Sequence, residues 1–363
     1  MKILPFTAFV GLDELKEALI CLAANPNIGG LLIIGPKGTG KSSIVRAFAD
    51  LLPEIEVSKN CPFNCNPYDP EEMCDICRRK YNKFGKLEAV RKKMEVVNLP
   101  VGATEDMVLG TINLERTLKE GKIVFEPGLL GRANRQILYI DEVNLLPDHI
   151  ADSILDAAAS GMHIVEREGV SLRHPAKFIL VGTMNPEEGE LRPQLLDRFS
   201  ISVKLTTLSD PDLRALIVKR NLEFEENPDE FKLKWRQKQA EVVEKIKRAK
   251  NLLKKVVISD ELIKVVSRTC AKLEVDGYRP DIVAVKMAKA LAALDGRLEI
   301  IEEDVFKGLK FALTHRTRAE GLKPPVDSKE LKDVFEEELR GIVAIAPHKK
   351  KEGRKSFFRI LYC

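Results

Sequence analysis

The feature that most constrains the fold of this chain is a glycine-rich segment between a short apolar run and a helical pattern. The segment reads Gly35-Pro36-Lys37-Gly38-Thr39-Gly40-Lys41-Ser42, which has the G-x-x-x-x-G-K-S spacing of a phosphate-binding loop. Residues 31–34 are apolar and fit a buried strand, and residues 43–48 have helical spacing. Glycines at these positions let backbone N–H groups and the helix N-terminus face phosphate oxygens. We therefore expect the loop to bind a nucleoside triphosphate, with Lys41 on the β- and γ-phosphates and Ser42 on Mg²⁺.

The bulk composition is that of a soluble globular protein of about two domains. Of the 363 residues, 44% are hydrophobic and 31% are charged, a balance that supports a packed core. No apolar run approaches the roughly 18 residues of a membrane span, and the start of the chain lacks the apolar core of a signal peptide. We therefore expect a cytoplasmic protein, in which seven cysteines do not form a disulfide framework. A net charge of +4 is too small to indicate a nucleic-acid partner.

Alternating strand and helix patterns predict an α/β fold with a largely parallel sheet. The strand-like runs lie at residues 31–34, 96–100, 136–142, 178–183 and 201–205, and beyond Ser209 the chain has wholly helical patterns. We expect a nucleotide-binding core at 1–209 that contains an insertion at 53–95. A charged helical linker at 210–257, with a solvated face, would lead to a helical domain at 258–345 and a basic tail at 346–363.

Hydrolysis of a nucleotide needs a metal ligand and a group that activates water, and the third strand-like run supplies both. Asp141 ends this run, where a carboxylate can meet Mg²⁺, and Glu142 follows it, where a carboxylate can polarise the attacking water. Asn185 follows the next run and could orient that water, although Asn-Pro is also a turn signal. Arg198 is a candidate arginine finger and Arg279 a second candidate phosphate sensor; the alternative for each is a surface salt bridge.

The order of these motifs resembles an AAA+ ATPase, and further segments resemble the small ATPase subunit of magnesium chelatase. The similar segments include residues 99–106, 125–130, 140–146, 157–161 and 185–199, and the resemblance covers about residues 6–318. It implies an AAA+ P-loop core followed by a helical lid domain, with ATP and Mg²⁺ as cofactors. It places Lys41, Ser42, Asp141, Glu142 and Asn185 at nucleotide positions of the same subunit, Arg198 on the finger that acts on the adjacent subunit, and Arg279 on the second sensor.

The same resemblance implies partners. Such subunits form homo-oligomeric rings, often hexameric, and work with an AAA+ subunit that carries an integrin-type domain. Together they drive a large porphyrin-binding subunit that inserts Mg²⁺ into protoporphyrin IX. Segments 119–125 and 162–172 resemble hairpins of this family and would contact the partners; without the resemblance they could be surface hairpins with no task.

Three alternative functions remain open from the sequence. A closely related motor serves cobalt chelatase, so Co²⁺ and another tetrapyrrole could replace Mg²⁺ and protoporphyrin IX. A DNA-remodelling ATPase would share the ring and the hairpins, but its hairpin tip should be basic, whereas residues 166–169 are mixed in charge. The third alternative is a non-enzymatic adaptor or a MoxR-type chaperone that assembles metalloenzymes.

The insertion carries four cysteines in two close pairs, Cys61 with Cys65 and Cys74 with Cys77. Pairs of this spacing let four thiolates converge on one metal. We expect a bound metal, with zinc ahead of an iron–sulfur cluster, and the alternative is a set of unligated thiols that could be redox-sensitive. The remaining cysteines and the five histidines lack metal spacing and are expected to be structural; these are Cys21, Cys270, Cys363, His149, His163, His174, His315 and His348.

Overall fold

Five parallel strands form the central sheet of the computed structural model, which describes residues 3–121, 124–167, 170–189, 191–316, 318–319 and 322–343. Every neighbouring pair is parallel, with Leu31 level with Val181 on one side and Ile201 on the other. The strands in spatial order are β11 (Ile201–Lys204), β1 (Leu31–Ile34), β10 (Ile179–Met184), β7 (Ile137–Ile140) and β4 (Val96–Leu99). All five strands were predicted, and the three central strands β1, β7 and β10 are buried throughout, as their continuous apolar runs indicated.

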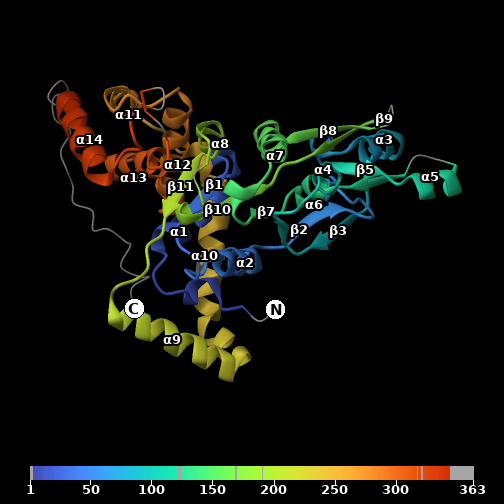
Figure 1. Cartoon of the computed structure of the whole chain (residues 1–363), viewed down its shortest axis with the longest axis horizontal. Coiled ribbons are helices and arrows are strands. Elements are labelled where there is room, and N and C mark those ends of the chain that lie inside the picture. The colour runs from blue at the N-terminus through green and yellow to red at the C-terminus, as the bar shows by residue number, and fades with distance from the viewer. Residues whose placement is uncertain are drawn as a thin grey trace.

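Helices cover both faces of this sheet (Figure 1). Successive strand residues point to opposite faces, so Leu31 and Ile33 join one hydrophobic cluster whereas Leu32 and Ile34 join another. The helices of the core are α1 (Asp13–Ala24), α2 (Lys41–Leu51), α4 (Glu105–Leu109), α6 (Leu129–Ala133), α7 (Asp148–Ser160) and α8 (Pro193–Arg198). The predicted α/β core is confirmed.

A second, helical domain packs against the first of these clusters. Its helices are α11 (Asp260–Lys272), α12 (Arg279–Leu294), α13 (Glu302–Leu313) and α14 (Ser328–Val343). Ser259 caps the start of α11 by accepting a hydrogen bond from the Leu262 N–H at 3.2 Å. Buried side chains of α12 and α13 share one cluster with β1 and α1. The helical domain therefore shares a hydrophobic core with the sheet.

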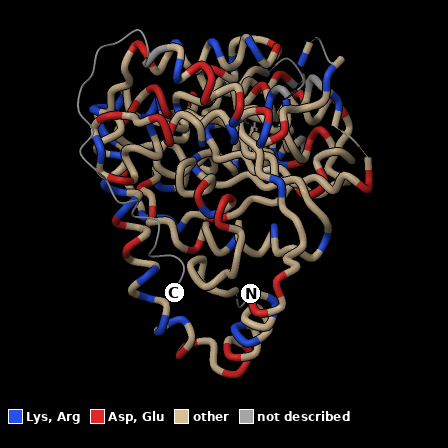
Figure 2. The backbone as a smooth tube through the Cα atoms, turned by 90° about the vertical axis from the view of Figure 1, so that its left-hand side faces the viewer, with Lys and Arg blue, Asp and Glu red and all other residues tan. Residues whose placement is uncertain are grey.

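Two helices connect these domains, and the first of them projects from the rest of the molecule together with the start of the second (Figure 1). They are α9 (Pro211–Glu226) and α10 (Pro228–Leu252), and the break falls at Asn227, whose side chain caps α10. The predicted solvated face holds for most of α10, but Phe231 and Ile246 are buried. Figure 2 shows Lys/Arg and Asp/Glu segments interspersed along this projecting end.

The insertion forms a small unit beside a hairpin. Strand β2 (Ile55–Ser58) pairs antiparallel with β3 (Ala89–Lys92), and α3 (Asp75–Phe84) lies between them in sequence. The hairpin consists of β8 (Met162–Arg167) and β9 (Val170–Pro175), paired from Met162 with Pro175 to Arg167 with Val170. The prediction of a hairpin at 162–172 is confirmed, and its turn residues, 168–169, lie outside the described residues.

The hairpin expected at residues 119–125 takes a different form. Strand β5 (Gly110–Ile112) pairs antiparallel with β6 (Phe125–Pro127), and α5 (Leu114–Glu120) connects them. Lys119 and Glu120 are therefore helical, because Asn113 accepts a hydrogen bond from the Arg116 N–H and caps α5. Residues 122–123 and the basic tail lie outside the described residues. Within the described ranges, the helices are too short or too polar to cross a membrane.

Candidate functional site

The phosphate loop joins the end of β1 to the start of α2, and its backbone requires glycine at three positions. A side chain at Gly35 would place its Cβ 2.8 Å from the Leu205 carbonyl oxygen. Gly38 and Gly40 both have φ of +80°, a region that other residues adopt at a cost. A Cβ at Gly38 would meet no atom within 4 Å. The loop is therefore open on the side of Gly38, so a ligand could approach its backbone there.

Lys41 is the first residue of α2, and its ammonium group is held by the loop itself. The Lys41 Nζ donates to the carbonyl oxygens of Gly35 and Pro36, the latter at 3.2 Å. Thr39 Oγ1 donates to the same Pro36 oxygen at 3.1 Å. Partial burial lowers the pKa of Lys41, and nearby Asp141 opposes that effect. A phosphate anion would replace these carbonyl partners with a stronger, charge-assisted one.

Asp141 and Glu142 follow β7, and one hydroxyl connects them. Thr183 Oγ1 donates to Asp141 Oδ1 at 2.7 Å and accepts a hydrogen bond from the Glu142 N–H at 3.1 Å. The Tyr139 hydroxyl donates to the same Asp141 oxygen at 3.1 Å. Glu142 has φ of +54°, an unfavourable region for glutamate that is typical of functional sites. The backbone at this strand end is thus held in one strained arrangement.

An ion pair brings the Glu142 carboxylate to the phosphate loop. Lys37 Nζ lies 3.3 Å from Glu142 Oε1 and also pairs with Glu188. Hydrogen bonding to Glu188, and then to Glu142, raises the pKa of Lys37. Residues predicted from two separate motifs, at residues 37 and 142, therefore lie within contact distance. This places a carboxylate beside the loop that would hold the phosphates.

Asn185 follows β10, the strand between β1 and β7. Its side chain is buried, and its oxygen accepts a hydrogen bond from the Glu187 N–H at 3.3 Å. This is the Asn-Pro turn that the sequence left open, and it anchors the side chain at the carboxyl edge of the sheet. Ligands of open α/β sheets bind at this edge.

The two candidate arginines lie together where the core meets the helical domain. Arg198, at the end of α8, pairs with Asp156 and donates to the Asp152 carbonyl oxygen at 3.3 Å, both on α7. Arg279 opens α12, and its Nη2 donates to the Arg198 carbonyl oxygen at 3.0 Å. Within the described residues, these arginines therefore bond to α7 and α8 rather than to the phosphate loop.

The sequence reading missed three residues of this site, namely Tyr139, Thr183 and Glu188. Two of them had a detectable signal, because alternate residues of a strand share a face. Tyr139 stands two positions before Asp141, and Thr183 stands two positions before Asn185. Glu188 had no such signal, since it is far from Lys37 in the sequence and the two residues meet only in the folded chain.

The four predicted metal ligands come together in the insertion. All four sulfur atoms lie within 4.8 Å of one another, and those of Cys61 and Cys74 are 4.0 Å apart. Cys65, Cys74 and Cys77 are buried. Hydrogen bonds from the other three thiols lower the pKa of Cys77, while the Cys61 thiol raises the pKa of Cys65. The cluster has the donor set of a thiolate metal site.

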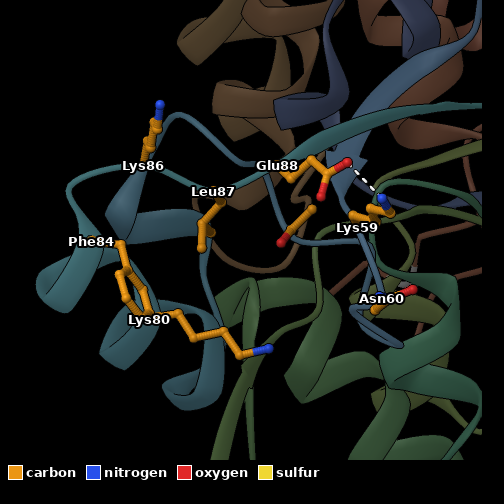
Figure 3. Close-up of a pocket in the computed structure, with 8 residues that line it drawn as sticks. Lys59, Asn60, Lys80, Phe84, Lys86, Leu87 and Glu88 are labelled. Carbon is orange, nitrogen blue, oxygen red and sulfur yellow. Dashed lines mark hydrogen bonds and ion pairs between the residues drawn. The ribbon is translucent and has the colours of Figure 1, made fainter.

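A pocket of about 520 Å³ lies on the same insertion (Figure 3). Three lysines, Lys59, Lys80 and Lys86, line it together with Phe84, and Lys59 pairs with Glu88, another lining residue. The phosphate loop contributes none of its lining residues. This pocket is therefore distinct from the candidate nucleotide site.

Comparison with known proteins identifies the family. The chain is 54% identical over 328 residues to the magnesium-chelatase subunit ChlI homolog of Methanocaldococcus jannaschii, covering 90% of this chain and 89% of that protein. It is 50% identical over 333 residues to magnesium-chelatase subunit ChlI of Synechocystis sp., covering 92% and 93%. This chain belongs to the magnesium-chelatase subunit ChlI family. The resemblance found in the sequence is confirmed.

Family models and solved structures agree with this assignment. Residues 86–199 match the AAA domain of the dynein-related subfamily, and residues 263–338 match the AAA lid domain. A chain from a structure of the complex between subunits BchI and BchD of magnesium chelatase is 38% identical, with 92% of this chain and 100% of that chain covered and a TM-score of 0.52. A putative ATPase from Cytophaga hutchinsonii, 17% identical with a TM-score of 0.58, shares the fold. The protein is an AAA ATPase subunit of the magnesium-chelatase type.

Proposed function

We propose that this protein is the ATP-hydrolysing motor of a metal chelatase, in which a separate large subunit inserts Mg²⁺ into protoporphyrin IX. The observation that carries the proposal is the phosphate loop beside the Asp141–Thr183–Glu142 arrangement, in a chain about half identical to ChlI subunits. This chain would supply force, and the porphyrin chemistry would take place on the partner.

The residues at the loop fit ATP with Mg²⁺. Gly35, Gly38 and Gly40 let the loop backbone curl toward a bound anion, and the open space at Gly38 would admit the phosphates. Lys41 would neutralise phosphate charge, and Ser42 and Asp141 would hold the metal ion. The remaining loop residues, Pro36, Lys37 and Thr39, complete the cradle. When bound, Mg²⁺-ATP supplies a phosphoanhydride bond whose hydrolysis releases the energy for movement.

Glu142 is the residue that we assign to water activation. Lys37 holds its carboxylate beside the loop, and the Thr183 hydroxyl holds its backbone. A carboxylate so placed can accept a proton from an attacking water. Asn185, on the neighbouring strand, would orient that water.

The proposed assembly is a ring in which Arg198 of one subunit completes the site of the next. Within its own chain the Arg198 side chain pairs with Asp152 and Asp156 of α7. In the proposed ring it would reach the nucleotide site of the adjacent subunit across the interface between subunits. Arg279 would connect the lid to this point through the Arg198 carbonyl oxygen. The other partners that we propose are an integrin-domain AAA+ subunit and the large porphyrin-binding subunit.

The test is reconstitution with those two partner subunits, followed by the absorbance change of the tetrapyrrole on metal insertion. Mg²⁺ and Co²⁺ are compared, and Lys41→Ala is the inactive variant. Lys219→Ala, exposed on α9, is the matched control. Mg²⁺ insertion that is lost only in Lys41→Ala supports the proposal. Preference for Co²⁺ would assign the motor to a cobalt chelatase, and active ATPase without insertion of either metal would indicate a chaperone of the MoxR type.

A further inference from the structure

We propose that Cys61, Cys65, Cys74 and Cys77 bind one zinc ion, and that the metal-bound insertion is the support on which the β8–β9 hairpin is fixed. This inference concerns a part of the chain that takes no role in nucleotide hydrolysis as described above. Sulfur spacing, backbone turns and contacts to β9 each contribute to it.

The spacing of the sulfur atoms fits a single tetrahedral ion. Metal–sulfur bonds of about 2.3 Å hold four tetrahedral sulfurs about 3.8 Å apart, and the four cysteine sulfurs lie within 4.8 Å of one another. A four-iron cluster would hold its cysteine sulfurs about 6 Å apart, because irons and sulfides lie between them. The cluster is too small for iron–sulfur cubane ligation, and it offers four thiolates, the ligand set of closed structural zinc sites.

The backbone holds the ligands in place before any metal binds. Cys74 is the N-cap of α3, and Cys77 lies one turn later, with its N–H donating to Cys74 Sγ at 3.5 Å. The Cys74 N–H donates to Cys65 Sγ at 3.1 Å. Such N–H···S bonds surround and orient metal-bound thiolates. Asn60 and Asn64, with φ of +59° and +47°, turn the chain next to Cys61 and Cys65.

The first cysteine pair contacts β9 through Phe63, the middle one of the three residues between Cys61 and Cys65. Phe63 stacks on His174 of β9, with ring centroids 4.6 Å apart and planes 16° apart. Its backbone oxygen accepts a hydrogen bond from Asn134 Nδ2 at 2.7 Å, which ties the loop to the core. Gly131 leaves room for this ring, since a Cβ there would lie 2.8 Å from Phe63 Cδ1.

The second pair is joined to the same strand. Asp75, next to Cys74, accepts a hydrogen bond from the Arg173 N–H at 2.9 Å. Leu172 of β9 shares a hydrophobic cluster with Phe63, Met73 and the three buried cysteines. Both ligand pairs therefore touch β9 through a residue within two positions of a ligand, and the metal would lock the two contacts together.

The insertion has only a small hydrophobic core of its own. Its two-stranded sheet, β2 with β3, is marginal as an isolated unit, and its cluster contains only a few large apolar side chains. Small units of this kind commonly depend on a metal for folding. Loss of the ion would therefore loosen the insertion and release the hairpin from its support.

The first experiment measures metal in the full-length protein purified without added metal or chelator. Elemental analysis should give about one zinc per chain, and Co²⁺ exchange should give the visible spectrum of tetrahedral thiolate ligation. Cys74→Ser with Cys77→Ser should lower the zinc content to below about 0.2 per chain, whereas Cys363→Ser should retain it. Zinc-free protein, or iron in place of zinc, would overturn the proposal.

The second experiment follows hydrogen exchange of the backbone amides of residues 171–174 of β9. Zinc removal from the folded wild type by a chelator should speed exchange there by at least about tenfold, zinc addition should reverse it, and amides of α2 should not change. Phe63→Ala should keep zinc and still speed exchange in β9. This comparison needs no cysteine variant to fold. Unchanged protection of β9 after zinc loss would refute the supporting role.

Discussion

The Thr183 hydroxyl binds both the carboxylate of Asp141 and the backbone N–H of Glu142, although Thr183 stands outside the sequence motifs. It donates to Asp141 and accepts from the Glu142 N–H while fully buried at 1% exposure. A buried group that loses such a partner pays its full desolvation cost. Thr183 therefore acts as a positioning residue for the strained turn at Glu142.

Thr183→Val should lower the free energy of unfolding by about 1–3 kcal/mol, because it removes the hydrogen-bond partner of the Glu142 N–H and one of the two donors to Asp141 Oδ1. Thr269→Val is the matched control: it is also buried, and its hydroxyl has no hydrogen-bond partner within the described structure. That control should change the unfolding free energy by less than about 0.5 kcal/mol. Urea unfolding of both variants measures the difference. Equal losses would show that the Thr183 bonds contribute nothing specific.

Glu142→Gln should preserve ATP binding and reduce kcat by about 10²–10⁴-fold, since the amide cannot accept the proton of the attacking water. Glu187→Gln, an exposed change at the same edge of the sheet, should leave kcat unchanged. Steady-state ATPase assays and equilibrium binding of a nucleotide analogue give the two quantities. Wild-type turnover in Glu142→Gln would assign water activation to another group.

The short helix α8 lies against α7, and this contact decides what Arg198 can reach. Arg198 bonds to Asp152 and Asp156 of α7. Its side chain therefore lies along α7. An arginine of this kind stabilises transition-state charge only where a second site meets it. The ring that we propose would provide such a site.

Arg198→Ala should reduce ATP hydrolysis by about 10³-fold or more if the arginine acts as a finger. Mixing it with Lys41→Ala tests whether the finger acts between subunits. In mixed rings, an intact nucleotide site of the first variant meets an intact Arg198 of the second, so activity should rise above that of either variant alone. If the mixture stays as inactive as its components, Arg198 acts within its own chain.

A buried histidine, His315, lies where the core meets the helical domain. His315 donates from Nε2 to the Phe199 carbonyl oxygen at 3.0 Å and is 2% exposed. Burial, followed by repulsion from Arg316, lowers the pKa of His315 to about 3. Burial likewise lowers the pKa of His174 to about 4. Both groups fit the structural role expected from the sequence.

Stability should therefore fall as the pH falls below about 6.5, the pKa of an unfolded histidine. Between that pH and the folded pKa of about 3, the unfolded chain binds the extra proton, which favours unfolding. From pH 7 to pH 5, His315 should account for a loss of about 2 kcal/mol. His315→Gln keeps an N–H donor and should flatten the pH dependence measured by urea unfolding, whereas the exposed His149→Gln should not. An unchanged slope in His315→Gln would contradict the prediction.

Local patterns in the sequence were sufficient for the strands, the phosphate loop and the start of α11, because each depends on neighbouring residues. Apolar runs mark buried strands, and the glycines of the loop meet a requirement of the backbone. The helix at residues 114–120 was missed because the cap at Asn113 and the pairing of β5 with β6 compete with the hairpin expected at 119–125. The roles proposed for Arg198 and Arg279 remain predictions.

Contacts between segments that are distant in the sequence became known only from the tertiary structure. The sequence identified Lys37, Glu142 and the four cysteines as candidates, since motif spacing carries that information. It could not reveal that Glu188 also pairs with Lys37, that the Thr183 hydroxyl joins the Asp141 carboxylate to the Glu142 N–H, or that Phe63 stacks on His174. These contacts join residues from 41 to 151 positions apart, and the register of strands and packing of side chains, rather than local propensity, bring such residues together.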